Sequence, residues 1–165
     1  MVPQINKILY VTDRSKNSSY AFLYAIDSAK KRYAKIVVLH VIEPVPAYAM
    51  AMAGMNNEPE DKQISEMVES MKKHLENFCR RADSQTGFPC ADLVEKILVK
   101  VGHPPEEILN TADKEECDMI VMGTHGKGFL THTFLGRVAL AVLQRTQKPV
   151  LTVPLPTKDF DWDDI

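Results

Sequence analysis

The chain has 165 residues, of which 45% are hydrophobic and 25% are charged, and its formal net charge is −2. These values are typical of a single globular domain, 1–165, that is large enough to bury a core. The weakly acidic balance argues against nucleic acid as a partner, because binding to a phosphate backbone needs a basic face. No apolar stretch suits a signal peptide or a membrane span, so we expect a cytoplasmic protein with no membrane partner.

The cysteines indicate the redox state that the sequence favours. Cys79, Cys90 and Cys117 show no C-x-x-C spacing and no neighbouring histidine at metal-ligand spacing. This usage is typical of proteins in a reducing compartment, where thiols stay free. We therefore expect free thiols and no metal site.

The N-terminal part of the chain predicts a strand, a helix and a second strand. An apolar run rich in strand formers at 7–12 predicts the first strand. A helical pattern follows over about 18–32, with Ser15 or Ser18 as the N-cap. The continuous β-branched run at 36–42 predicts a second strand that is covered on both faces of a parallel sheet.

The segment 44–59 contains prolines and methionines and predicts a long, flexible loop. The apolar spacing over 61–85 then predicts one long amphipathic helix. The tail 155–165 combines acidic residues with Phe160 and Trp162, and we expect a frayed end, with docking on a partner subunit as the alternative. The remaining predicted elements are a strand at 92–101, a helix at 104–116, a strand at 117–122, a helix at 133–146 and a strand at 148–153.

Strict alternation of strands and helices predicts the fold class. It is typical of an α/β, doubly wound, Rossmann-like domain with a five-stranded parallel sheet and right-handed crossovers. Ligands of such sheets bind at the carboxyl ends of the strands, where the strand order reverses. If the first and fourth strands are neighbours there, Asp13 and the loop after Gly123 face one crevice. Asp13 is then a candidate to bind ribose hydroxyls.

The loop after the fourth strand carries glycines at fixed offsets, Gly123, Gly126 and Gly136. Glycine permits positive φ and a close approach of a ligand to the main chain. Successive N–H groups, together with the positive end of the following helix, form an anion site. The loop therefore predicts phosphate binding, and a purely turn-forming role for the glycines is the alternative.

Other nucleotide and catalytic motifs are missing from the sequence. The loop lacks the lysine and hydroxyl of a P-loop, and the turn after the first strand lacks the glycines of a dinucleotide fingerprint. No G-x-S-x-G elbow is present. We therefore expect a binding protein rather than an enzyme, with slow hydrolysis of the phosphate ligand as the most that its chemistry supports.

Over 7–153 these residues resemble the universal stress protein family. The most specific match is the G-x2-G-x9-G pattern formed by Gly123, Gly126 and Gly136. The resemblance implies a flavodoxin-like sheet with strand order 3-2-1-4-5 and a homodimer formed through the last strand, Val150 to Val153. In one branch of the family it also implies an adenine nucleotide, ATP, with or without Mg²⁺.

The resemblance also implies a set of site residues. Asp13 and Val41 would contact the ribose and adenine, the backbones of the three glycines would enclose the phosphates, and the loop from His125 to Gly128 would donate N–H groups. The candidate site comprises Thr12, Asp13, Val41, Met122, Gly123, His125, Gly126, Gly128, Gly136, Arg137 and Val138.

The chain departs from the ATP-binding branch at Arg137, where that branch has Ser or Thr. A guanidinium is a charged donor set suited to phosphate, but its bulk can also fill the pocket. Two hypotheses follow besides the slow ATPase. One is an ATP-binding homodimer in stress response or signalling, and the other is a dimeric interaction module of the same family that binds no nucleotide.

Overall fold

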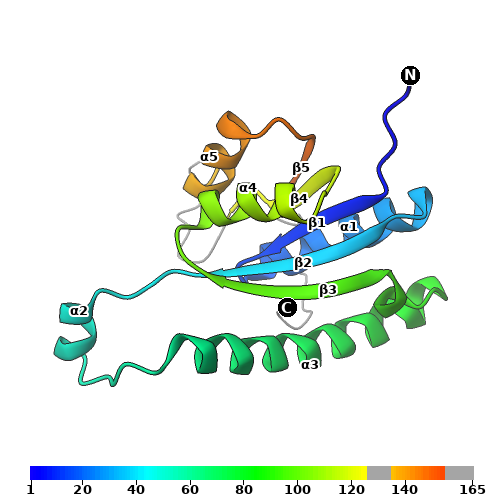
Figure 1. Ribbon diagram of the computed structural model, residues 1–165. Helices are drawn as coiled ribbons and strands as arrows, with labels where there is room; N and C mark the ends of the chain where they lie inside the picture. The colour runs from blue at the N-terminus through cyan, green and yellow to red at the C-terminus, as the bar shows by residue number, and fades with distance from the viewer. Residues whose placement is uncertain (126–134, 155–165) are drawn as a thin grey trace.

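The computed structural model describes residues 1–125 and 135–154. In these ranges the chain forms a five-stranded sheet with the order β3-β2-β1-β4-β5, in which all neighbouring strands are parallel (Figure 1). The predicted fold class and strand order are confirmed. The strands are β1 (Lys7–Thr12), β2 (Lys35–Ile42), β3 (Val94–Val101), β4 (Met119–Gly123) and β5 (Val150–Val153).

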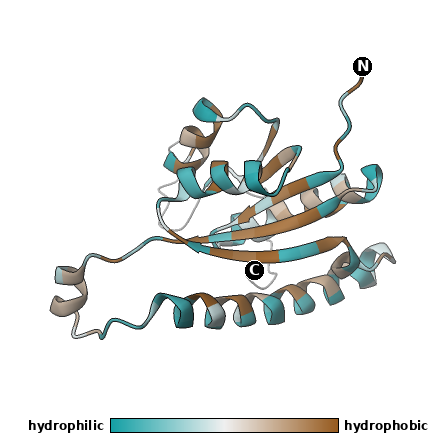
Figure 2. Ribbon diagram, viewed as in Figure 1, coloured by the Kyte–Doolittle hydropathy of each residue, from teal (hydrophilic) through white to brown (hydrophobic). Residues whose placement is uncertain are grey.

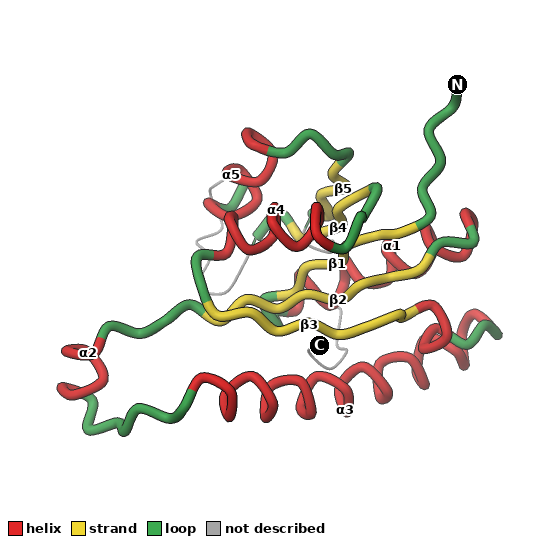
Figure 3. Tube along the Cα trace, viewed as in Figure 1, coloured by secondary structure: helices red, strands yellow, loops and turns green. Residues whose placement is uncertain are grey.

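Helices cover both faces of this sheet, as the tube drawing in Figure 3 shows. Residues of α1 and α3 share a core with one face, and residues of α4 and α5 share a core with the other. In the described ranges, none of the helices is both long enough and apolar enough to cross a membrane. The helices are α1 (Lys16–Arg32), α2 (Ala47–Met52), α3 (Glu60–Thr86), α4 (Pro104–Lys114) and α5 (Arg137–Arg145), with a 3-10 turn, η1 (Cys90–Leu93).

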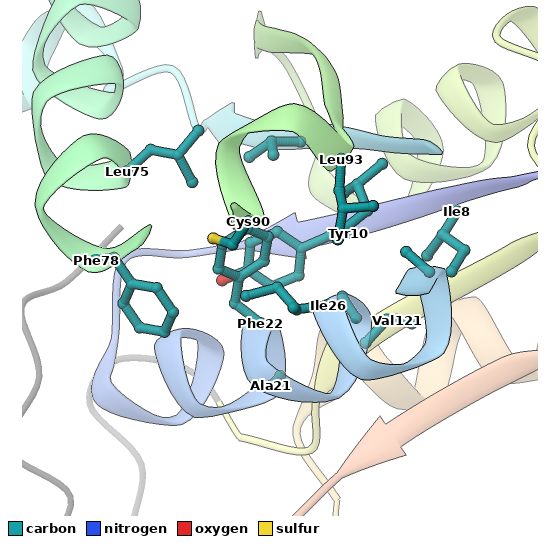
Figure 4. Packing of buried hydrophobic residues seen from close by; sticks show 14 of the residues in the cluster. Ile8, Tyr10, Ala21, Phe22, Ile26, Leu75, Phe78, Cys90, Leu93 and Val121 are labelled. Carbon is teal, nitrogen blue, oxygen red and sulfur yellow. The ribbon is translucent and has the colours of Figure 1, made fainter. Parts of the chain in front are cut away.

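The central strand β1 contributes to both cores because its side chains alternate. Ile8 and Tyr10 point to the α1 and α3 side, and Leu9 and Val11 point to the other. Figure 4 shows Tyr10 next to Phe22, with ring centroids 4.6 Å apart. The buried Tyr10 hydroxyl donates a hydrogen bond of 2.6 Å to the Ser18 carbonyl. This bond fixes the start of α1 against the strand that leads into the candidate site.

The segment predicted as a loop at 44–59 contains a short helix, α2, that the sequence analysis missed. Its residues are Ala, Tyr and Met, and Ala and Met favour helix, whereas the prolines mark only the flanks. The hydrogen bonds of Ala49, Met50 and Ala53 stay within the segment. Figures 1 and 2 show α2 projecting beyond the carboxyl edge of the sheet. Apolar side chains of α2 such as Met52 are exposed.

The expectation of free thiols is wrong for two of the three cysteines. Cys79 on α3 and Cys90 in η1 form a disulfide, with their Cα atoms 5.3 Å apart. The chain reverses at Gly87, which ends α3 in the left-handed conformation with a φ of 66°, and this turn brings the two cysteines together. Disulfides persist in oxidising surroundings. Cys117 is a buried free thiol.

The other boundaries differ from the predicted ones by a few residues. The N-cap of α1 is Ser15, whose side chain accepts a hydrogen bond from the Ser18 N–H. The last helix begins at Arg137. The predicted helical residues 133–134 and the tail 155–165 lie outside the described residues.

Candidate functional site

A pocket of about 690 Å³ opens at the carboxyl ends of β1, β2 and β4. This volume is within the range of about 300–1,000 Å³ typical of small-molecule sites. Because β1 and β4 are neighbours where the strand order reverses, Asp13 and the Gly123 loop face the same pocket, as the alternation of elements predicted. The candidate residues that line it are Thr12, Asp13, Val41, Met122, Gly123, His125, Gly136, Arg137 and Val138. Gly126 and Gly128 lie outside the described residues.

The loop between β1 and α1 forms one wall of the pocket. Oδ1 of Asp13 accepts a hydrogen bond of 2.9 Å from the Ser15 N–H, which orients the carboxyl group. The Thr12 and Ser18 hydroxyls lie 3.0 Å apart and are buried under this loop. The carboxylate is therefore held by the same turn that caps α1.

His40 lies at the floor of the pocket, at the end of β2. Its Nδ1 lies 2.8 Å from the Thr12 carbonyl oxygen. Since a carbonyl can only accept, Nδ1–H is the donor, and this bond fixes the tautomer of a neutral imidazole. His40 is half-buried and lines the pocket, so it belongs to the site rather than to the core alone.

Gly123 and Gly136 are needed for close packing rather than for positive φ. A Cβ on Gly123 would lie 2.7 Å from Oδ1 of Asn17, and a Cβ on Gly136 would lie 3.0 Å from the Thr124 carbonyl oxygen. The φ of Gly136 is −67°. The positive φ that glycine permits is thus not used at Gly123 or Gly136.

Asn17 is a site residue that the sequence analysis missed. It is 3% exposed, its Oδ1 accepts from the His125 N–H at 2.9 Å, and its Nδ2 donates to the Val153 carbonyl at 3.2 Å. One amide thus ties α1 to the ends of β4 and β5. The only signal in the sequence is a polar residue in the first turn of α1, and its partners are far away along the chain.

The opposite wall of the pocket has positive character. Gly136 is the N-cap of α5 and has no side chain to satisfy the free N–H groups of the first helical turn. Arg137 begins α5 and is exposed at the pocket lining. A carboxylate on one wall and a cationic helix start on the other suit a ligand that carries both hydroxyls and phosphate.

The described residues contain no group of three or more His, Cys, Asp or Glu side chains that could hold a metal ion by themselves.

The universal stress protein family model matches residues 4–154 of the chain. The chain belongs to the universal stress protein family. Universal stress protein MJ0577 of Methanocaldococcus jannaschii is 31% identical over 157 residues, which cover 89% of this chain and 93% of the relative. The fold, the strand order and the family predicted from the sequence are thus confirmed together.

Solved structures share this flavodoxin-like fold. A structure of MJ0577 matches with a TM-score of 0.70 and 28% identity, covering 94% of this chain and 100% of that one. A universal stress protein solved in complex with cAMP matches with a TM-score of 0.56 and 22% identity, covering 92% and 98%. A universal stress protein of Archaeoglobus fulgidus in complex with dAMP matches with a TM-score of 0.50 and 20% identity, covering 93% and 99%.

Proposed function

We propose that this universal stress protein binds an adenine nucleotide, ATP, in the pocket between β1 and β4. The observation that carries the proposal is the convergence of nine candidate residues, far apart in the sequence, on one pocket at the strand-order reversal. Two proteins of the same fold have been solved with the adenine nucleotides cAMP and dAMP. The role is signalling or protective binding in a stress response rather than substrate turnover.

The two walls of the pocket suggest the orientation of the ligand. Asp13 would accept hydrogen bonds from ribose hydroxyls, and Val41 would contact the adenine. The phosphates would lie toward Gly123, Gly136 and the start of α5, where unsatisfied N–H groups and the helix dipole favour negative charge. Thr12, Met122, His125 and Val138 complete the lining, and Gly126 and Gly128 follow in the same loop. Mg²⁺, where present, would be carried by the phosphates.

A second part of the proposal is a homodimer through β5. This strand pairs with β4 and is the edge strand of the sheet within the described residues. An edge strand presents unpaired N–H and C=O groups to another chain. The edge of Val150–Val153 is therefore the surface on which we place a second copy.

Replacement of Asp13 tests the nucleotide site. Asp13→Asn keeps an oxygen for the Ser15 N–H but removes the charge that strengthens hydrogen bonds to ribose hydroxyls. We expect ATP affinity to fall about tenfold, since hydrogen bonds to charged groups contribute about 1.5–3 kcal/mol. Asp27→Asn is the matched control, because Asp27 is exposed on α1 and pairs with Lys31. If both variants and the wild type bind ATP with equal affinity, Asp13 does not contact the nucleotide.

A further inference from the structure

Arg14 follows Asp13 directly and has an unusual backbone conformation. Its φ is 65°, in the left-handed region that favours glycine. The Arg14 N–H donates a hydrogen bond of 3.0 Å to the Thr12 hydroxyl, which holds this conformation in place. A residue with a long side chain thus occupies a position where glycine would be free of strain.

The side chain of Arg14 leaves the pocket loop and reaches one face of α3. Nη1 lies 3.4 Å from Sδ of Met67, and Nη2 lies 3.5 Å from the Ser70 hydroxyl, which accepts from it. Nη2 also lies 3.2 Å from Nδ1 of His74, whose own N–H donates to the Ser70 carbonyl at 2.8 Å. Positions 67, 70 and 74 are spaced three and four residues apart and share one helix face. The guanidinium is therefore a bridge between the pocket loop and α3.

Within residues 1–125 and 135–154, this bridge has no counter-ion. Arg14 is half-buried, its Nε is buried with no hydrogen-bond partner among these residues, and none of its contacts there is a carboxylate. Taking a cation partly out of water without a partner of opposite charge is unfavourable. The contacts of the guanidinium with α3 therefore offset part of this desolvation cost.

We propose that Arg14 is a positioning residue that sets two walls of the nucleotide pocket by clamping the β1–α1 loop to α3. The inference rests on the proposed function and extends it to a residue that does not line the pocket. Asp13 and Ser15, the partners in the hydrogen bond that orients the carboxylate, lie on either side of Arg14. Met67, which the guanidinium contacts, lines the pocket from α3.

The test removes the contact between Arg14 and α3 by a substitution on either side of it. Arg14→Gly removes the guanidinium and accepts a positive φ without strain. Ser70→Ala removes the hydroxyl on α3 that accepts from Nη2 of Arg14. Arg80→Ala is the control, because Arg80 is an exposed arginine on the same helix.

Two measurements distinguish a positioning role of Arg14 from a general effect on the stability of the fold. The first is hydrogen exchange of the Ser15 amide by NMR without nucleotide, because this amide donates to Asp13. The second is the Kd for ATP. We expect Ser15 exchange to accelerate and ATP to bind more weakly, each about tenfold, in Arg14→Gly and Ser70→Ala, as expected for loss of a hydrogen bond to a charged group. Arg80→Ala should leave both unchanged.

Unchanged Ser15 exchange in both clamp variants would overturn the inference. If the wild type binds no ATP, the proposed function fails, and the Ser15 measurement still decides the role of Arg14. If Arg14→Gly does not fold, Ser70→Ala tests the same contact from α3.

Discussion

At the residue scale, Arg137 is the candidate residue for which the sequence allows both a contact with phosphate and an obstruction of the pocket. Its side chain is exposed at the pocket lining and leaves a cavity of about 690 Å³ open. An arginine at the start of a helix can donate several hydrogen bonds to one phosphate. We therefore interpret Arg137 as a phosphate ligand rather than an obstruction.

This interpretation predicts the effect of Arg137→Ser. Loss of a charge-assisted contact should weaken ATP binding by about 1.5–3 kcal/mol, or roughly tenfold or more. Calorimetric titration of both proteins measures the difference. Tighter binding by the serine variant would show instead that the arginine fills the phosphate position.

The buried amide of Asn17 gives a second residue-scale prediction. Asn17→Ala removes the hydrogen bond that the His125 N–H donates to Asn17, and the Val153 carbonyl keeps only the bond from the Thr124 N–H. Loss of a buried hydrogen bond that leaves a polar group behind costs about 1–3 kcal/mol, so we expect the free energy of unfolding to fall by roughly that amount in urea denaturation. Asn110→Ala, at an exposed position of α4, should change it by less than about 0.5 kcal/mol. Equal effects at the two positions would contradict the role of Asn17.

At the element scale, the three cysteines differ in their chemistry. Cys79 and Cys90 form a disulfide where α3 leads into η1. Cys117 precedes β4, and burial raises the pKa of its thiol to about 11. The raised pKa favours the protonated thiol in the folded state. Its contribution to stability is therefore present below the ordinary pKa of a thiol and is lost as the pH rises through about 11.

Thiol counting with a disulfide reagent at pH 8 checks this arrangement. The native protein should show no reactive thiol, because Cys117 is buried and protonated. Unfolding without reductant should expose one thiol, and unfolding after reduction should expose all three. Three thiols after unfolding without reductant would show that Cys79 and Cys90 are not joined.

The edge of β5 gives another prediction at this scale. The carbonyls of Pro149 and Val153 accept hydrogen bonds from β4, so the N–H of Thr152 points to the open edge. Thr152→Pro should therefore block pairing with a second copy and leave the β4 ladder intact. We expect sedimentation to show a dimer for the wild type and a monomer for this variant. A dimer that survives the substitution would place its interface elsewhere.

The helices and strands were largely predictable because each follows from a local pattern. Continuous apolar runs marked β1 and β2, and helical spacing marked α3. The short α2 was missed because its flanking prolines suggested a loop. The disulfide depends on a chain reversal at Gly87, and the partners of Asn17 lie 108 and 136 residues away. Contacts of this kind leave no local pattern in a single sequence.

At the scale of the whole molecule, the strand order makes the pocket. Placing β1 next to β4 brings a carboxylate loop and a glycine loop to the same edge, with α5 starting beside them. Nine of the candidate residues line this pocket, because they lie at the ends of β1, β2 and β4 or at the start of α5. His40 lines the pocket as well, and Asn17 and Arg14 support it through contacts that no motif marked.

Isothermal titration of the purified wild-type protein with ATP and Mg²⁺ tests the central claim most directly. Nucleotide that co-purifies would first be removed and identified after denaturation of a separate sample. We predict saturable binding with a Kd near the micromolar range, about −8 kcal/mol. An absence of binding heat at millimolar ATP, in protein shown to be free of nucleotide, would contradict the account and leave the dimeric interaction module.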